Sequence, residues 1–286
     1  MTNRFGSWGR TLCLALACVA AACSLDTNEP AIDTSQSNLD PEVLSITLRV
    51  PSGASFLDTT VGAATRVRIG DRAQVRGGVF GADGDVEIGK EAKLSSALVT
   101  AVGDVELGKQ ARIEGDVRAT GKVRRAPGSS VHGRLEAPAN IDVSTQSWSV
   151  TASPTSLGDV VVARGVTRDL SPGTYDELIA ASGATVVLHS GVYVVSKALF
   201  FRGSELELDD GAGPVQLYVR DESYFRAATR STTASEPKLL VSHLGSKELI
   251  VRPPFAGAVV APNASVSLER CDDKRDDDCE RDHWKR

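Results

Sequence analysis

Apolar residues recur at every sixth position through much of the first half of the chain. A second series follows two residues behind the first, and glycine or polar residues occupy most of the positions between. The first series comprises Val105, Ala111, Val117, Val123, Ser129, Leu135 and Ile141, and the second comprises Leu107, Ile113, Ala119, Arg125, Val131, Ala137 and Val143, with Ser129 and Arg125 as the polar interruptions. A six-residue period moves around the surface of an α-helix, so the pattern indicates short strands with two inward side chains each and a corner between them.

The same phase continues upstream, with a slip of one residue between successive units. The inward residues predicted there are Val67, Ala73, Val79, Val86, Ala92 and Leu98. Three hexads return the chain above its start, which predicts a parallel β-helix with about 18–19 residues per coil and coils stacked about 4.8 Å apart. Outward residues also form columns, and we interpret the column Arg68, Glu87, Glu106 and Arg124 as a solvent-exposed ladder of charges.

Residues 60–145 resemble the bactofilins, a bacterial family of polymer-forming cytoskeletal proteins. The resemblance rests on the hexad phase and on segments such as Val117–Val123, with the sequence VRATGKV. It implies a triangular β-helix that associates end to end. An N-terminal export signal and a second folded region depart from the pattern of that cytoplasmic family, so we carry over the fold and not the cytoskeletal function.

Residues 146–268 continue in β structure. The segment Leu170–Tyr175 (LSPGTY) is echoed 18 residues later by Leu188–Tyr193 (LHSGVY), and short strand-like runs follow. This region resembles a secreted bacterial β-helix domain of unknown function, through Leu170–Tyr175 and the later segment Gly257–Val266. The expected fold class is therefore all-β, with two consecutive parallel β-helical segments. Microbial ice-binding β-helices share the outline, but the threonines of this chain do not recur at the coil spacing.

The N-terminus has the features of an export signal. Two arginines precede a run of small and apolar residues at 11–22, which is too short to span a bilayer, and Cys23 follows directly. This arrangement resembles the bacterial lipoprotein signal, which implies lipidation at Cys23, and Ser24 implies sorting to the outer membrane. The expected organisation is a signal peptide at 1–22, a flexible tether at 23–46, a bactofilin-like β-helix at 47–145, a second β-helical domain at 146–268 and a charged tail at 269–286.

The charge and the cysteine content indicate which partners and which disulfide to expect. The net charge is −5 and no basic block is present, so we expect no nucleic-acid partner. After export, acylation of Cys23 leaves Cys271 and Cys279 in an oxidising compartment, and we expect them to form a disulfide within the charged tail. The membrane, through the lipid anchor, is the first expected partner. Envelope proteins, glycans and a second copy of the chain are the others.

No catalytic motif stands out. The four histidines form no metal-binding spacing, no G-x-S-x-G is present, and we expect no catalytic residue, no metal and no cofactor. His189 and His243 could converge in space to form a site. The other interpretation is that each occupies an ordinary side-chain position in the β-helix. The pair Asp209–Asp210, with the segment 220–222, is a cluster of charges that the solvation of turns also explains.

The sequence therefore favours a non-enzymatic envelope lipoprotein with a structural or adhesive role. The alternative is a glycan-binding or glycan-cleaving β-helix, which would need an outward groove lined by aromatic rings. Tyr175 and Tyr193 are the candidate ligand-binding residues because they recur at the same place in two repeats. Stacking of the two rings inside the core is the other interpretation of the same spacing.

Overall fold

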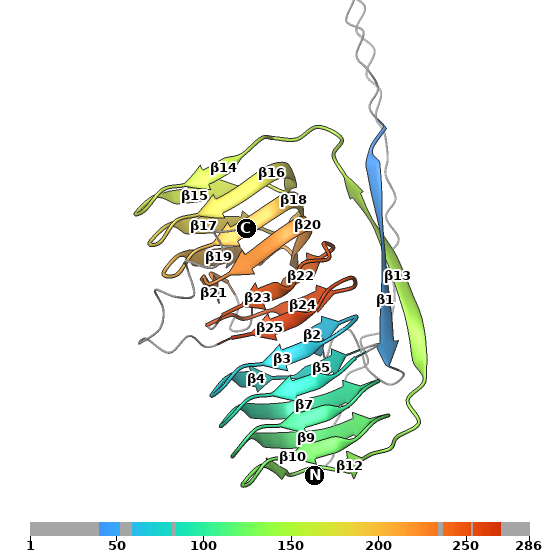
Figure 1. Cartoon of the computed structure of the whole chain (residues 1–286). Helices are drawn as coiled ribbons and strands as arrows, with labels where there is room; N and C mark the ends of the chain where they lie inside the picture. The colour runs from blue at the N-terminus through green and yellow to red at the C-terminus, as the bar shows by residue number, and fades with distance from the viewer. Residues whose placement is uncertain (1–39, 52–58, 82–83, 234–236, 253, 270–286) are drawn as a thin grey trace, which may run out of the picture. The chain divides into compact units, whose positions relative to one another are not determined.

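The chain forms a single parallel β-solenoid of about ten turns, which confirms the predicted all-β fold class (Figure 1). The computed structural model describes residues 40–51, 59–81, 84–233, 237–252 and 254–269. Within these ranges every regular element is a strand, so the described residues include no apolar helix that could cross a membrane. Cys23, Cys271 and Cys279 lie outside the described residues, so lipidation and the disulfide stay predictions.

The lower half of the solenoid is built by residues 59–136 (Figure 1). Its strands are β2 (Thr59–Ala63), β3 (Val67–Ile69), β4 (Gln74–Arg76), β5 (Gly78–Gly81), β6 (Val86–Ile88), β7 (Lys93–Ala101), β8 (Val105–Leu107), β9 (Arg112–Ala119), β10 (Val123–Arg125), β11 (Ser130–Val131) and β12 (Leu135–Glu136). The hexad series point inward as predicted as far as Ala119, and Ala111, Ile113 and Val117 are fully buried. Arg125 is exposed, and Val143 lies on β13 (Val143–Ala152) outside the solenoid, so the series do not stay inward to their last members. The predicted column of charges is confirmed too. In the strand register Arg68 lies opposite Glu87, Glu87 opposite Glu106, and Glu106 opposite Arg124.

The assignment of Leu98 to the core was wrong by one residue, because Val99 takes the inward position. The register of β7 against β9 shifts between Ser95 and Ala97, so Val99 lies opposite Val117 and is fully buried. Leu98, which the pattern assigns to the core, lies opposite Asp116 and is partly exposed. An extra residue absorbed in a bulge turns the next side chains to the opposite face. The bulge thus accounts for one slip in the hexad phase.

Corners of the lower half are tied by aspartates that reach the coil below. Asp85 Oδ1 accepts the backbone N–H of Asp104 at 2.8 Å, and Asp104 Oδ1 accepts that of Lys122 at 2.7 Å. A Cβ atom at Gly103 would lie 2.3 Å from the Asp85 carboxylate, and one at Gly121 would lie 2.1 Å from that of Asp104. Glycine is therefore needed at these corners to admit the carboxylate of the coil above.

The upper half is built by residues 157–269 (Figure 1). Its strands are β14 (Val160–Val162), β15 (Thr167–Leu170), β16 (Gly173–Ala180), β17 (Thr185–His189), β18 (Gly191–Phe200), β19 (Glu205–Asp209), β20 (Val215–Phe225), β21 (Ala228–Ser231), β22 (Leu239–His243), β23 (Leu249–Val251), β24 (Ala258–Ala261) and β25 (Val266–Leu268). Phe200 and Phe225 stack inside it with ring centroids 5.1 Å apart. The upper core is therefore filled partly by aromatic rings.

The two halves are stacked in the reverse of their order along the chain. The last strands of the upper half, β24 and β25, pair in parallel with the first strands of the lower half, β2 and β3. We call this junction the seam. One inward column consequently runs through both halves, in the order Gly173, Tyr193, Leu217, Val241, Val259, Val61, Val79, Val99, Val117 and Leu135.

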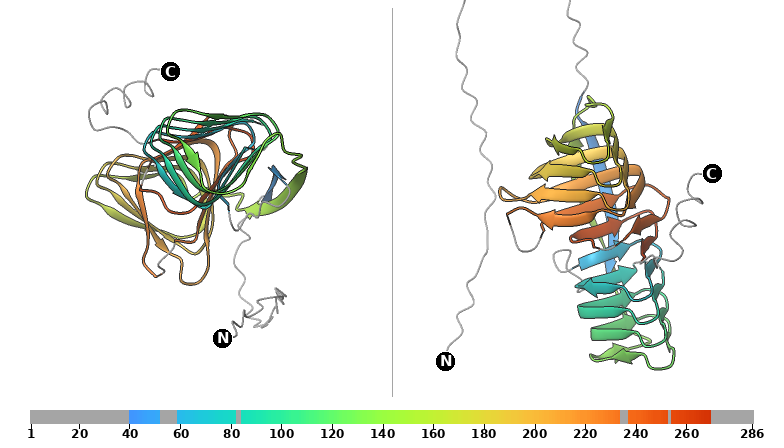
Figure 2. Two further views of the ribbon diagram at one scale, coloured as in Figure 1. Left: turned by 90° about the horizontal axis from the view of Figure 1, so that it is seen from below. Right: turned by 90° about the vertical axis from the view of Figure 1, so that its left-hand side faces the viewer.

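The solenoid has three walls, which are seen along the axis in Figure 2. The first wall holds β22, β24, β2, β5, β12, the beginnings of β16, β18 and β20 and the ends of β7 and β9. The second wall holds β14, β23, β25, β3, β6, β8, β10 and the ends of β16, β18 and β20. The third wall holds β15, β17, β19 and β21 above, and β4, β11 and the beginnings of β7 and β9 below.

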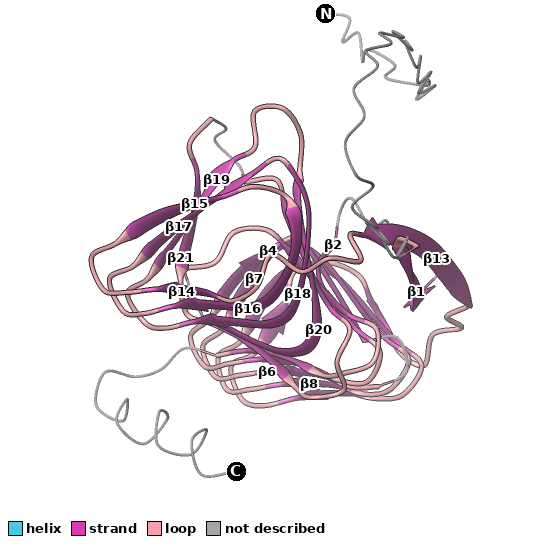
Figure 3. Ribbon diagram, turned by 90° about the horizontal axis from the view of Figure 1, so that it is seen from above, coloured by secondary structure: helices cyan, strands magenta, loops and turns pink. Residues whose placement is uncertain are grey.

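A two-stranded ribbon lies along the outside of the first wall (Figure 3). It consists of β1 (Glu42–Pro51) and β13 (Val143–Ala152), which pair antiparallel. β1 begins inside the range that we expected to be tether. The ribbon covers two outer apolar clusters: one around Ile46, Val150, Val194 and Tyr218, and another of Leu48, Val50, Phe80 and Val260. The first wall is therefore buried on both of its faces where the ribbon covers it.

Candidate functional site

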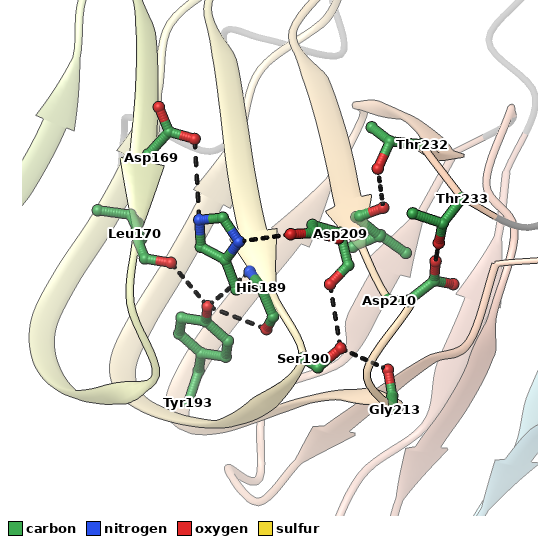
Figure 4. Close-up of polar contacts among 11 residues, drawn as sticks. Asp169, Leu170, His189, Ser190, Tyr193, Asp209, Asp210, Gly213, Thr232 and Thr233 are labelled. Carbon is green, nitrogen blue, oxygen red and sulfur yellow. Dashed lines mark hydrogen bonds and ion pairs between the residues drawn. The ribbon is translucent and has the colours of Figure 1, made fainter.

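A histidine between two aspartates lies on the outer side of the third wall (Figure 4). His189 ends β17 and is in register with Asp209, which ends β19 on the next coil. Its Nδ1 lies 2.9 Å from Asp209 Oδ2, and its Nε2 lies 3.9 Å from Asp169 Oδ1 on the coil on the other side. The sequence pattern did not predict this cluster, although His189 and Asp209 each directly follow a strand-like run and lie 20 residues apart.

This cluster is open to solvent. The side chains of His189, Asp209 and Asp169 are 42%, 47% and 71% exposed. The nearby Ser190 hydroxyl donates to the carbonyl oxygens of Asp209 and Gly213, at 3.0 and 2.8 Å. Because that hydroxyl is directed at backbone oxygens, it does not form the nucleophile–base pair that acyl-transfer chemistry requires. The geometry is that of a surface network of polar contacts.

Tyr193 supports the cluster from inside the solenoid (Figure 4). Its hydroxyl donates to the Leu170 carbonyl oxygen at 2.8 Å and accepts the backbone N–H of His189 at 2.9 Å. Burial raises the pKa of the Tyr193 phenol above its usual value. The hydroxyl therefore stays protonated and ties the corner after β15 to the corner after β17.

The two candidate ligand-binding tyrosines are core residues. Tyr193 is fully buried and Tyr175 is 6% exposed, and their rings stack with centroids 6.5 Å apart. They are not equivalent in register, because Tyr193 lies opposite Gly173 and Tyr175 lies opposite Val195. The interior interpretation of their spacing is the correct one. An outward aromatic groove at these two positions was the wrong interpretation, since both positions belong to the inward face of their strands.

The cluster of charges expected around Asp209–Asp210 does not assemble. Asp210 is fully buried and accepts three hydrogen bonds: from the Ser231 and Thr233 hydroxyls, both at 2.6 Å, and from the Lys238 backbone N–H at 2.9 Å. Arg220 instead pairs with Glu42 of the ribbon, at 2.5 Å. Asp210 closes a loop of the backbone, which is a structural role.

Hydrogen bonding controls the protonation of Asp210. Burial alone would raise the pKa of this carboxyl group, because it penalises the charged form. The three hydrogen bonds outweigh burial and lower the pKa to about 2. Asp210 is therefore a buried carboxylate at neutral pH, and its charge is held by donors from residues 231–238.

A second histidine lies inside the core and does not approach His189. His243 is fully buried, and its Nε2 lies 2.7 Å from the Lys247 carbonyl oxygen, which requires the proton on that nitrogen. Its Nδ1 accepts the hydroxyl proton of Ser223 at 2.7 Å. Although a serine–histidine pair has the composition of a catalytic dyad, Ser223 is only 4% exposed, so a substrate does not reach it in this conformation.

His243 should make stability depend on pH. Burial lowers its pKa below the usual value near 6.5 and outweighs the opposite influence of the Lys247 carbonyl and of Glu222 and Asp221. The unfolded chain then takes up a proton before the folded one, so stability is full above pH 6.5 and falls as pH drops below it, by at most about 1.4 kcal/mol per pH unit. Urea unfolding between pH 7.5 and 5 measures this slope.

The control separates His243 from the other titrating groups. His243→Asn should flatten the slope between pH 6.5 and 5, so the difference between the variant and the parent chain gives the contribution of His243. Identical slopes in the parent and in His243→Asn would contradict the assignment.

The comparisons with known proteins do not extend the identification beyond the fold. No family model, no curated protein and no solved structure matches the chain. The class of protein is therefore defined by its architecture, which is a parallel β-solenoid and is consistent with a bactofilin-like β-helix. Within the described residues, no group of three or more histidines, cysteines and carboxylates is arranged to hold a metal ion.

Proposed function

We propose that this protein is a non-enzymatic envelope lipoprotein whose β-solenoid serves as a structural or adhesive rod and joins other copies through its ends. The observation that carries the proposal is the state of those two ends. Both have strand edges without a partner among the described residues; the upper end exposes three large apolar side chains and the lower end exposes one. We also propose a lipid anchor at Cys23 and an outer-membrane location, which the N-terminal sequence supports.

The upper end of the solenoid is apolar. β14 pairs only with β16, and β15 pairs only with β17, so each has one free edge within the described part of the chain. Leu157, Val161 and Val166 lie on this first coil and are 62%, 68% and 46% exposed. Exposed apolar side chains beside free strand edges are characteristic of surfaces that pair with another chain.

The lower end resembles the upper one. β10, β11 and β12 each pair only with the coil above them, as far as the described residues extend. Leu135 on β12 is 42% exposed, and it ends the inward column of the first wall. Only one other large apolar side chain of the described residues is comparably exposed, which is Val43 on the ribbon. The exposed apolar side chains are thus concentrated at the two ends.

Self-association should depend on both ends. We expect the parent chain to form concentration-dependent oligomers in sedimentation velocity, and Leu135→Lys and Val161→Lys each to shift it toward the monomer. A lysine on a strand edge brings a charge that must be desolvated when the next copy pairs. The matched control is Val43→Lys, because Val43 is 59% exposed and lies on the ribbon rather than on a terminal coil of the solenoid. A parent chain that stays monomeric at all concentrations, or a control as impaired as the end variants, would contradict the proposal.

Membrane attachment should depend on Cys23. The cysteine follows an apolar run of 12 residues, so Cys23→Ser should abolish lipidation and release the protein from the membrane fraction. Detergent partitioning and intact mass measure the two effects. A serine variant that remains in the membrane fraction with unchanged partitioning would exclude the anchor.

A further inference from the structure

The seam joins the two halves without a covalent link at the junction. In the first wall, Val61, Gly62 and Ala63 pair with Val259, Val260 and Ala261. In the second wall, Val67, Arg68 and Ile69 pair with Val266, Ser267 and Leu268. These are the same parallel, in-register pairs that join successive coils elsewhere. The seam is therefore a coil-to-coil contact through two walls, between segments about 200 residues apart.

The third wall contributes no strand pairing to the seam. Within the described residues, β21 pairs only with β19 and β4 pairs only with β7. The coils at the seam thus hold each other through two walls, whereas most coils of the lower half hold each other through three. Because the stability of a solenoid is approximately a sum of nearest-neighbour contacts, the seam is a weaker joint than those inside the lower half.

The connection between the halves runs outside the solenoid. Residues 142–159 lead from the lower end, through β13, to the upper end (Figure 1). The ribbon contacts both sides of the seam, since Leu48 and Val50 pack against Phe80 of the lower half and Val260 of the upper half. Each half therefore has its own edge at the seam, and the covalent connection does not pass through that edge.

We propose that the seam also forms between two copies of this chain, with the upper half of one copy docked on the lower half of another. In this exchange β24 and β25 of one copy pair with β2 and β3 of the second, through the contacts that the single chain makes. Exchange of an identical element keeps every contact when β13 moves with the upper half and pairs with β1 of the second copy, so the cost is the association of the copies and any strain in the connection. The partner is thus a second copy of this chain.

Concentration decides between the two arrangements. Before β13 pairs with β1, the connection is a flexible link that holds the two edges of one chain at an effective concentration in the millimolar range. Exchange becomes competitive when copies are folded together at comparable local concentration. The contact differs from the pairing of solenoid ends proposed above, because it uses strand edges that are buried in the closed chain.

Thr65 and Ser265 provide a direct test across the seam. Their hydroxyl oxygens lie 3.0 Å apart, one on each half. The full chain carrying Thr65→Cys and Ser265→Cys together should oxidise to a covalently closed monomer when folded dilute. For the test, two full-length single variants are unfolded together, refolded and oxidised, one carrying Thr65→Cys and labelled with heavy isotopes, the other carrying Ser265→Cys.

An exchanged seam should give a reducible dimer of twice the chain mass, in which the labelled peptide around residue 65 is linked to the unlabelled peptide around residue 265. The yield of this mixed dimer should rise with protein concentration during refolding. It should fall when the oxidised double variant, whose own seam is covalently closed, replaces the two single variants. The linkage should persist in the background of Leu135→Lys and Val161→Lys, which separates exchange from the pairing of ends. If the double variant closes but the mixture never yields the mixed peptide at any concentration, the seam forms only within one chain and the proposal is wrong.

Discussion

Val117→Asp is expected to unfold the lower half of the solenoid or to lower the free energy of unfolding by at least about 4 kcal/mol. Val117 is fully buried between Val99 and Leu135 in the inward column of the first wall. A carboxylate there would lose its hydration, and the neighbouring inward side chains offer it no hydrogen bond. Thermal unfolding followed by circular dichroism gives the loss of stability.

Arg118→Asp is the matched control for that change. Arg118 points outward next to Val117, and its side chain is 32% exposed. It pairs with Glu136 at 3.2 Å, so the substitution replaces a partly exposed ion pair by two like charges and should cost about 1 kcal/mol. A loss in Arg118→Asp as large as that in Val117→Asp would mean that the inward and outward faces of β9 are wrongly assigned.

Asp210→Ala is expected to have the second largest effect, about 3 kcal/mol, because it leaves three donors around a buried position without their acceptor. The change should loosen the backbone at Ser231, Thr233 and Lys238, which hydrogen exchange measures directly. Asp209→Ala is the control, since the neighbouring Asp209 side chain is 47% exposed and pairs only with a surface histidine. Equal destabilisation by the two alanine variants would contradict the structural role of Asp210.

Acid should reproduce part of the effect of Asp210→Ala. With a pKa of about 2 in the folded chain, against the usual 3.8, the Asp210 carboxylate stabilises the fold fully above pH 4. That contribution is lost as pH falls from 4 through 2, where the folded state also takes up the proton. The stability of the parent chain and of Asp210→Ala should therefore converge over this interval. A constant difference down to pH 2 would exclude the titration of Asp210 as its cause.

The sequence determined the local repeat. Inward side chains must meet at every coil, so the six-residue period of Val105, Ala111 and Val117 was sufficient to predict the strands, the coil length and the charge ladder. Prediction failed at Leu98, because a bulge changes the face of a side chain without changing the composition of the segment. The stacking of Tyr175 and Tyr193 was also predictable, but not the face on which it occurs.

Only the tertiary structure decided how the repeats are joined. Every coil presents the same kind of strand edge above and below, so the sequence does not specify that Val259 meets Val61 or that the halves stack in reverse order. The covering of the first wall by the ribbon and the approach of His189 to Asp209 depend on the same long-range arrangement. The repeat is encoded in contacts between neighbouring coils, whereas the order of the halves depends on a connection that runs outside the repeat, where no period constrains the residues.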